Sequence, residues 1–542
     1  MTRTSAGTRA RALTAAFFAL LVLAGLLTCG GYGQPWDEPW EMDILRMNLN
    51  EYAALLGSDS RLALESSVEK PESGRISDSV EKDHGVSAYL PVGWLVAAPM
   101  DAAARMQLWH MWTWLLFALG AGALYAISRR LGLSRVLAGA AALLLVLSPR
   151  FFAEGHYNNK DVVLLSLTLC CVWQAMRLME KQSVPRALCF ALFGALAANT
   201  KVAGLAVWGL CGLAVLAHCL AAKKKGWLPA MLWAMAGFAA LYALLTPALL
   251  GDPAGYLAYA VQNALSFTRW DHYVLFRGAV FWLKTQPLPR YYLPLMIAVT
   301  TPLCVLALAA VGQASALRRA RHQPIFSDAT TLSLLLCTAL WALPLGLAVA
   351  TSARAYNGWR HYYFVYGPML VLAAWGLRAL AHVRRARARN ALLALVAAGL
   401  LLCGVEVATG HPHQYAYYNA LARRDAAANR YELDYWNVSA LGALEQACGL
   451  ESGEVRIAGV DAWAQTGLEN AAAVLPGALR GRVRVLPMGS AEADYLLENP
   501  TYAVLSGWSP GAGEELIAGE SAYGAALMRV YRRGAQAGGT EE

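Results

Sequence analysis

Long apolar segments recur from about Leu13 to about residue 408, and they constrain the fold more than any other feature of the sequence. Hydrophobic residues make up 57% and charged residues 15% of the 542-residue chain. Apolar runs of this length are typical of membrane-spanning helices and not of soluble domains. The sequence therefore predicts a mainly α-helical, polytopic protein whose first partner is the lipid bilayer.

The charge pattern indicates the number and direction of the spans. The net charge of +9 comes from short Lys and Arg clusters between apolar runs, as in cytoplasmic loops, so nucleic acid is not an expected partner. These clusters fall in alternate loops of about eleven expected helices, which predicts a cytoplasmic N-terminus. The expected helices lie near residues 13–27, 108–128, 136–150, 161–179, 186–200, 203–221, 227–247, 291–312, 331–350, 362–380 and 391–408.

An acidic pair follows the first apolar run directly. Residues 35–43 read P-W-D-E-P-W-E-M-D, with Asp37 and Glu38 between Trp36 and Trp40. The predicted topology places this stretch on the outer face, within a first outer loop of residues 31–107. There the carboxylates would meet the polar head of a lipid-linked substrate.

The chain from residue 411 onward has a different pattern. Short β-like runs at 455–460, 483–488 and 502–506 alternate with helix-like stretches at 437–449 and 491–498. This alternation predicts a small α/β domain. We therefore expect a transmembrane domain over residues 1–410 and an extracytoplasmic α/β domain over residues 411–542.

Two further outer loops carry cations, against the usual preference for positive charge in the cytoplasm. The first, at 148–161, reads S-P-R-F-F-A-E-G-H-Y-N-N-K-D, and the second, at 352–364, reads S-A-R-A-Y-N-G-W-R-H-Y-Y-F. A guanidinium at the mouth of a helix bundle can bind a phosphate through two hydrogen bonds. Aromatic side chains beside it can stack on sugars or line an isoprenoid groove. The outer loops therefore predict an anion-binding site.

Several of these stretches resemble the GT-C superfamily of glycosyltransferases that use polyprenyl-phosphate sugars. The likeness is to bacterial members of family 39, which includes protein O-mannosyltransferases and lipid A aminoarabinose transferases. The matching stretches are W-D-E at 36–38, D-H-G-V at 83–86, the loop at 148–161, W-R-H-Y-Y-F at 359–364, H-P-H-Q-Y-A-Y-Y-N at 411–419 and Y-E-L-D-Y-W at 431–436. The resemblance implies a protein of the bacterial inner membrane that transfers a sugar, with inversion, from a polyprenyl-phosphate donor to an unknown acceptor.

The resemblance also implies roles for individual residues. Asp37 is the expected general base, and Glu38 is expected to orient Asp37 or bind the acceptor. One carboxylate suffices because a phosphate leaves without a general acid, but the charge growing on that phosphate needs fixed cations nearby. The candidates for binding the donor phosphate are Arg360, Lys160, Arg150 and Arg354. The candidates for other substrate contacts are Trp36, His84, His156, Asp161 and His361.

Other interpretations remain open at this stage. No metal or cofactor is expected to be required, since cations can neutralise the phosphate and most of the ten cysteines lie in apolar runs without metal-ligand spacing. The alternative is an Mg²⁺ or Mn²⁺ site formed by Glu154, His156 and Asp161 with Asp37 and Glu38. A transporter or flippase for a lipid-linked sugar would share the membrane composition but place its ionisable residues near the middle of the membrane. A membrane scaffold with an outer binding domain would leave the acids and cations without a common purpose.

Overall fold

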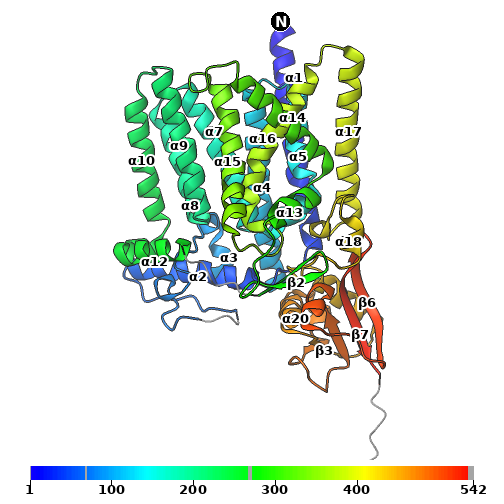
Figure 1. Cartoon of the computed structure of the whole chain (residues 1–542). Coiled ribbons are helices and arrows are strands. Elements are labelled where there is room, and N and C mark those ends of the chain that lie inside the picture. The colour runs from blue at the N-terminus through cyan, green and yellow to red at the C-terminus, as the bar shows by residue number, and fades with distance from the viewer. Residues whose placement is uncertain (1, 67–69, 266–271, 535–542) are drawn as a thin grey trace, which may run out of the picture.

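The computed structural model describes residues 2–66, 70–265 and 272–534, and it is mainly helical (Figure 1). Within these residues nine helices are long and apolar enough to cross a membrane, so the chain is a multi-pass membrane protein. They are α1 (Thr2–Thr28), α4 (Ala102–Arg130), α7 (Asp161–Glu180), α9 (Ala203–Ala221), α10 (Trp227–Leu244), α14 (Leu303–Ala320), α15 (Ala329–Thr351), α16 (Tyr366–Ala381, extended by the 3₁₀ turn Arg360–Val365) and α17 (Ala386–Thr409).

The expected eleven spans become nine or ten, and proline explains part of the difference. Helix α5 (Arg135–Val146) and helix α6 (Pro149–Tyr157) together form one apolar stretch, but it bends by 70° before Pro149. Proline disfavours helical geometry in the residue before it, which accounts for the break. The other expected span that is not among the nine is the one at 186–200. Helix α8 (Val184–Thr200) lies there, and it is apolar but only 17 residues long. The expected span at 291–312 is also divided, into α13 (Tyr292–Thr300) and α14, and only α14 is long enough to cross. Every expected span is therefore largely helical, but three are not single straight crossings with the predicted bounds.

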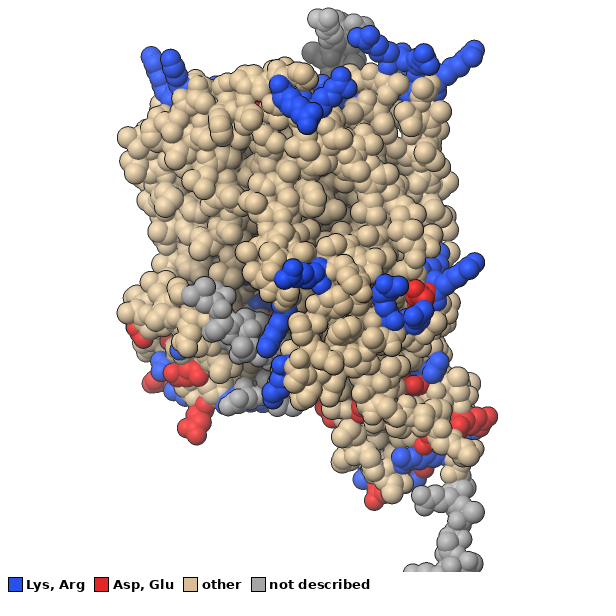
Figure 2. All heavy atoms as spheres, viewed as in Figure 1, with Lys and Arg blue, Asp and Glu red and all other residues tan. Residues whose placement is uncertain are grey.

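Lys and Arg gather at the end of the bundle where the N-terminus lies (Figures 1 and 2). Short connections meet there, including Lys223–Lys225 between α9 and α10, and Arg384 and Arg385 before α17. Hardly any Asp or Glu is visible at this end, whereas both signs of charge mix at the other end. The two ends of the bundle thus differ in charge as the sequence predicts, while the side of the membrane that each faces stays a prediction.

The other end of the bundle is covered by short helices that run across it (Figure 1). The most important is α2 (Glu38–Leu55), which begins one residue after Asp37 and has Pro39 in its first turn, where proline fits a helix best. Other elements at this end are α3 (Trp94–Ala97), α11 (Pro247–Gly251), α12 (Pro253–Leu265), the antiparallel hairpin β1 (Tyr273–Phe276) and β2 (Ala279–Trp282), α13 (Tyr292–Thr300) and α18 (Arg423–Ala427).

The C-terminal part forms a mixed five-stranded sheet in the order β4-β3-β5-β7-β6. Strands β3 and β4, and β3 and β5, pair in parallel, while β5–β7 and β6–β7 are antiparallel. This confirms the predicted α/β composition. The elements are α19 (Ala440–Leu450), β3 (Val455–Gly459), α20 (Ala462–Val474), α21 (Gly477–Arg480), β4 (Val483–Val485), β5 (Tyr495–Glu498), α22 (Pro500–Ser506), β6 (Glu514–Ala522) and β7 (Ala525–Arg533).

Two local predictions in this domain are wrong. Residues 502–506 belong to helix α22, because the Asn499 side chain accepts a hydrogen bond from the Thr501 amide and Pro500 occupies the first helical position. Residues 495–498, predicted as helix, form the fully buried strand β5 between β3 and β7. A four-residue apolar strand buried on both faces has no alternation that would distinguish it from a helix.

The C-terminal sheet has an apolar core of its own beside the larger core of the helical part. This smaller core holds residues of α19, α20 and the sheet together with Met106 of α4. Three residues of the C-terminal part belong to the larger core: Tyr502, Ala525 and Leu527. The segment from Tyr415 to Val438 also packs into the larger core of the helical part. A stretch of non-helical chain that includes Tyr435 and Trp436 therefore connects the two parts.

Helices α14 and α16 cross at close range, and two glycines permit the approach. A Cβ atom on Gly312 would lie 1.8 Å from the Leu372 carbonyl oxygen, and one on Gly376 would lie 2.1 Å from the Leu308 carbonyl oxygen. Small residues at a helix crossing are a common means of close packing within membranes.

We expect Gly312→Leu to lower the thermal unfolding temperature in detergent, because the new side chain collides with the backbone of α16 and overpacking costs about 1–3 kcal/mol. The matched control is Gly346→Leu on α15, where an added Cβ meets nothing within 4 Å. Both changes gain the same helix propensity. Equal unfolding temperatures for the two variants would contradict the close crossing.

Candidate active site

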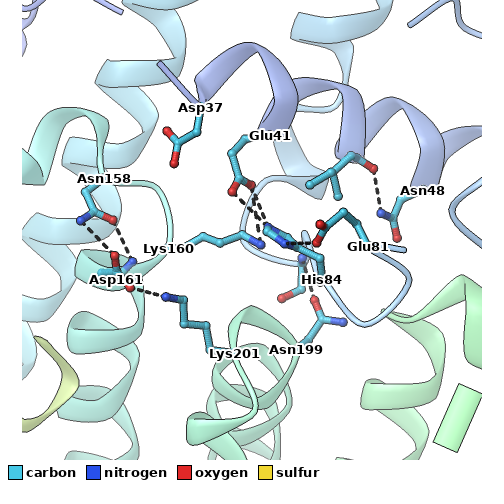
Figure 3. Close-up of polar contacts among 12 residues, drawn as sticks. Asp37, Glu41, Asn48, Glu81, His84, Asn158, Lys160, Asp161, Asn199 and Lys201 are labelled. Atoms are coloured by element: carbon cyan, nitrogen blue, oxygen red, sulfur yellow. Dashed lines mark hydrogen bonds and ion pairs between the residues drawn. The ribbon is translucent and has the colours of Figure 1, made fainter. Parts of the chain in front are cut away.

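Asp37 lies in the turn between α1 and α2, at the bundle end opposite the N-terminus. Its side chain is 22% exposed, and its Oδ2 lies 3.9 Å from Nη1 of Arg360, in the 3₁₀ turn that precedes α16. Asp37, just before α2, and Glu41, on α2, point toward Lys160, Asp161 and Lys201 at the ends of the facing helices (Figure 3). The structure thus brings the first outer loop and the later outer loops into one cluster.

Arg360 is the centre of this cluster. The same Nη1 lies 3.8 Å from Oδ2 of Asp161, and the guanidinium carbon lies 4.6 Å from the ring centre of Trp436 and 5.4 Å from that of Tyr356. The aromatic faces favour a cation, and the guanidinium is planar enough to stack on them. Both carboxylate contacts are longer than a hydrogen bond, and the buried Nε has no hydrogen-bond partner among the described residues. Arg360 therefore keeps donors that an anion could use.

Asp161 begins α7 and is tied down on two sides. Its backbone N–H donates to Oδ1 of Asn158 at 2.9 Å, and its carboxylate forms an ion pair with Lys201. The ammonium nitrogen of Lys201 lies 3.4 Å from Nδ1 of His361. Three elements far apart in sequence therefore place one carboxylate and three basic side chains together.

A second group of charges surrounds His84. One ring nitrogen lies 3.0 Å from Glu41 Oε2 and the other lies 3.1 Å from Glu81 Oε2. Burial lowers the pKa of His84, but the two carboxylates raise it more, to about 10. His84 is therefore an imidazolium at neutral pH, and both of its N–H groups donate. Lys160 Nζ lies 3.6 Å from the same Glu41 oxygen, so Glu41 has two cationic neighbours.

The pKa of Asp37 is raised from 3.8 to about 7. Burial is the largest cause; Arg360 lowers the pKa, while Glu41, Asp161 and Glu38 raise it. A carboxyl group with a pKa near 7 exchanges its proton close to neutral pH, which suits a general base. Perturbed groups in such clusters are candidates for catalytic residues.

Glu38 turns away from this cluster. Its Oε1 accepts a hydrogen bond from Gln34 Nε2 at 3.0 Å, and its Oε2 lies 2.8 Å from Nε2 of His110 on α4. Its side chain is only 2% exposed. Adjacent residues at the start of a helix point in different directions, so the acidic pair is divided between the open cluster and the protein core.

Three other candidates also lie apart from Asp37. His156 packs its ring on Trp114, with ring centres 4.5 Å apart, and its Nδ1 lies 2.9 Å from the Phe152 carbonyl oxygen. Arg150 is buried and donates from Nη2 to the Tyr417 carbonyl oxygen at 3.3 Å. Arg354 is exposed and forms no ion pair with Asp37 or Asp161. Trp36, in contrast, directly precedes Asp37 and donates its backbone N–H to the Trp436 carbonyl oxygen at 3.0 Å.

The five residues of the alternative metal site do not converge. Glu154 Oε1 accepts hydrogen bonds from the hydroxyls of Tyr363 at 2.8 Å and Tyr435 at 3.1 Å. Glu38 and His156 face other partners, as described above. Among residues 2–66, 70–265 and 272–534, no group of three or more His, Cys, Asp or Glu side chains has an arrangement that could hold a metal ion.

Sequence reasoning missed Lys201, Glu41 and Trp436 as members of the site. Lys201 was visible as a charge between two apolar runs at N-T-K, a position where an unpaired cation would be costly. Trp436 stands in the motif Y-E-L-D-Y-W, and Glu41 in the stretch that contains Asp37. The motifs supplied these signals, but only the packing of α2, α7 and α9 shows which side chains meet.

Fold and site together define a multi-pass helical membrane protein with a cluster of acids and cations at the end opposite its basic loops. No family model matches the sequence, and no curated protein matches it. Solved structures that are similar include ArnT from Cupriavidus metallidurans bound to undecaprenyl phosphate, with TM-score 0.45 and 14% identity over 98% of this chain and 99% of that one. Another is the arabinofuranosyltransferase AftD from mycobacteria (mutant R1389S), with TM-score 0.45 and 15% identity over 97% of this chain and 42% of that one. At these values neither likeness assigns a role to any residue of this chain.

We expect Asp37→Asn to raise the thermal unfolding temperature at pH 8. The carboxyl group has a pKa of about 7 in the folded chain against an ordinary value of 3.8, so ionising it opposes folding increasingly from about pH 4 to pH 7 and fully above pH 7. Asparagine removes that penalty, and the gain should be smaller at pH 5 than at pH 8. The control is Asp59→Asn in the same outer loop, where the side chain is exposed. A gain that does not depend on pH would contradict the raised pKa.

Proposed function

We propose that the chain is a membrane glycosyltransferase that transfers a sugar, with inversion, from a polyprenyl-phosphate donor to an acceptor on the outer face of the membrane. The observation that carries the proposal is the contact between Asp37 and Arg360. It joins a carboxyl group of pKa about 7 to a guanidinium with unused donors, 3.9 Å apart at the end of the helix bundle. The resemblance of the surrounding motifs to family 39 supports the same assignment.

The roles follow from the chemistry of the transfer. Asp37 takes the proton of the acceptor hydroxyl or amine as that group attacks the anomeric carbon. Arg360 and Lys160 hold the donor phosphate and stabilise the charge that develops on it as it leaves. Asp161, paired with Lys201, keeps the Arg360 guanidinium oriented. No general acid is needed because the phosphate leaves as an anion.

An inverting displacement places the sugar carbon between the base and the leaving phosphate. Asp37 and Arg360 must therefore part when the donor binds, and their 3.9 Å separation is too long to be a hydrogen bond that resists this. Because Arg360 lowers the pKa of Asp37, its move to the phosphate makes Asp37 a stronger base. Donor binding would thus prepare the base for the acceptor.

The position of the ionisable cluster favours transfer over transport. Asp161 and Lys201 lie at the ends of their helices, and Asp37 lies in a turn outside them. A transporter tends to hold such residues on broken helices near the middle of the membrane. The basic clusters at the opposite end of the bundle support an outward-facing site, with the N-terminus on the cytoplasmic side of a bacterial inner membrane.

We expect Asp37→Asn to reduce transfer from a radiolabelled polyprenyl-phosphate sugar by about 10²–10⁴-fold, the usual contribution of a general base. The wild-type kcat/KM should rise with pH through about 7, because Asp37 of the free enzyme must be ionised to act as base. The assay uses purified protein with a panel of donors, with and without a chelator. The matched control is Glu38→Gln, which changes the adjacent acid. Near-normal turnover by the Asp37 variant would rule out Asp37 as the base.

We expect Arg360→Ala to raise the KM for the donor by about 10–100-fold, since a hydrogen bond to a charged group contributes about 1.5–3 kcal/mol. The KM for the acceptor should change much less, because of the two substrates the Arg360 guanidinium would contact only the donor, at its phosphate. Arg354→Ala, which removes an exposed cation from the same loop, should leave both values unchanged. An unaltered donor KM in the Arg360 variant would exclude it as the phosphate ligand.

A further inference from the structure

The C-terminal domain contacts the backbone of the turn that carries Asp37. Nδ2 of Asn470, on α20, donates to the carbonyl oxygens of Pro35 at 3.1 Å and of Trp36 at 3.2 Å. These are the last two carbonyl groups before Asp37. One side-chain amide, 435 residues along the chain from Pro35, therefore holds both of them.

The position of the Trp36 carbonyl group determines how the backbone enters Asp37. It lies in the same rigid peptide plane as the backbone nitrogen of Asp37, because the peptide bond does not rotate freely. Fixing this oxygen fixes the direction in which the chain enters Asp37. The direction of the Asp37 carboxyl group then depends on only a few remaining torsions.

A second connection reaches the other half of the site. The Trp36 backbone N–H donates to the Trp436 carbonyl oxygen, and the Trp436 ring lies over the Arg360 guanidinium. The segment that carries Trp436 is bound to the C-terminal domain, since Asn437 Nδ2 donates to the Trp463 carbonyl oxygen at 2.8 Å. The domain therefore contacts the supports of both the acid and the cation.

We propose that the C-terminal domain sets the geometry of the catalytic centre, with Asn470 as the positioning residue for Asp37. This inference rests on the proposed function, in which Asp37 is the base. It gives the domain a task in catalysis that does not require it to bind substrate. Only a side chain with two N–H groups on one atom can satisfy both carbonyls in this way.

The test uses Asn470→Asp and Asn470→Ala in the full-length protein. Aspartate keeps the shape of asparagine but has no donor when ionised, so it repels the two carbonyl oxygens. The matched control is Glu469→Ala on the same helix, where the exposed carboxylate accepts a hydrogen bond from Gln465 Nε2, also on α20. Asn470→Gln keeps both N–H groups and should retain more activity than alanine.

We expect kcat to fall by about tenfold in Asn470→Ala, because the Asp37 carboxyl group is then held less firmly toward the acceptor. The donor KM should stay close to wild type. The acid limb of the pH–rate profile should move to higher pH in Asn470→Asp, because the added negative charge raises the pKa of Asp37. A purely structural role would lower the unfolding temperature and leave kcat of the folded Asn470→Ala enzyme unchanged.

Hydrogen exchange gives a readout that does not depend on activity. The backbone amides of Trp36 and Glu38 donate to Trp436 O and Pro35 O, and their exchange should become faster in Asn470→Ala but not in Glu469→Ala. Unchanged exchange at both amides, or unchanged kcat in an active protein, would overturn the inference. Absence of transfer by the wild-type protein would instead overturn the proposed function, and the exchange result would still decide whether Asn470 holds the turn.

Discussion

The buried charge of Arg360 is the constraint on which the site depends. A guanidinium withdrawn from water must find carboxylates or aromatic faces, and Arg360 has Asp37, Asp161, Trp436 and Tyr356 around it. These partners come from the first outer loop, from α7, from the segment before α16 and from the connection to the C-terminal domain. One cation therefore requires four distant parts of the chain to be in place together.

The contrast between Asp37 and Glu38 shows how a helix start can divide two like charges. Glu38 enters the core, where His110 and Gln34 satisfy it, and so fixes the first turn of α2 against α4. Asp37 stays at the edge with only a long contact to Arg360, and burial without a close partner raises its pKa to about 7. Glu38, which has close partners, anchors the turn, whereas Asp37, which has none, can still exchange a proton.

The two parts of the chain also divide the work of building the site and holding it in place. The helical part supplies every charged group of the cluster, and the segment from Tyr415 to Val438 supplies the Trp436 ring and the carbonyl oxygen that accepts the Trp36 N–H. Through Asn470, the smaller domain contacts only backbone carbonyls of the turn. Helices fix the charges, and the smaller domain holds the loop, which is an arrangement that suits the proposed transfer from a lipid-linked donor.

The sequence by itself determined the membrane class, the helical segments and the loops that carry Asp37, Asp161 and Arg360, because apolar run length and local motifs are readable along one chain. It did not determine that Lys201 pairs with Asp161, that His156 faces Trp114 instead of Asp37, or that Asn470 reaches Pro35. These contacts join residues 40 to 435 positions apart, and no local pattern encodes them. Only the packing of helices and domains decides them, since a side chain's partners depend on which faces meet in three dimensions.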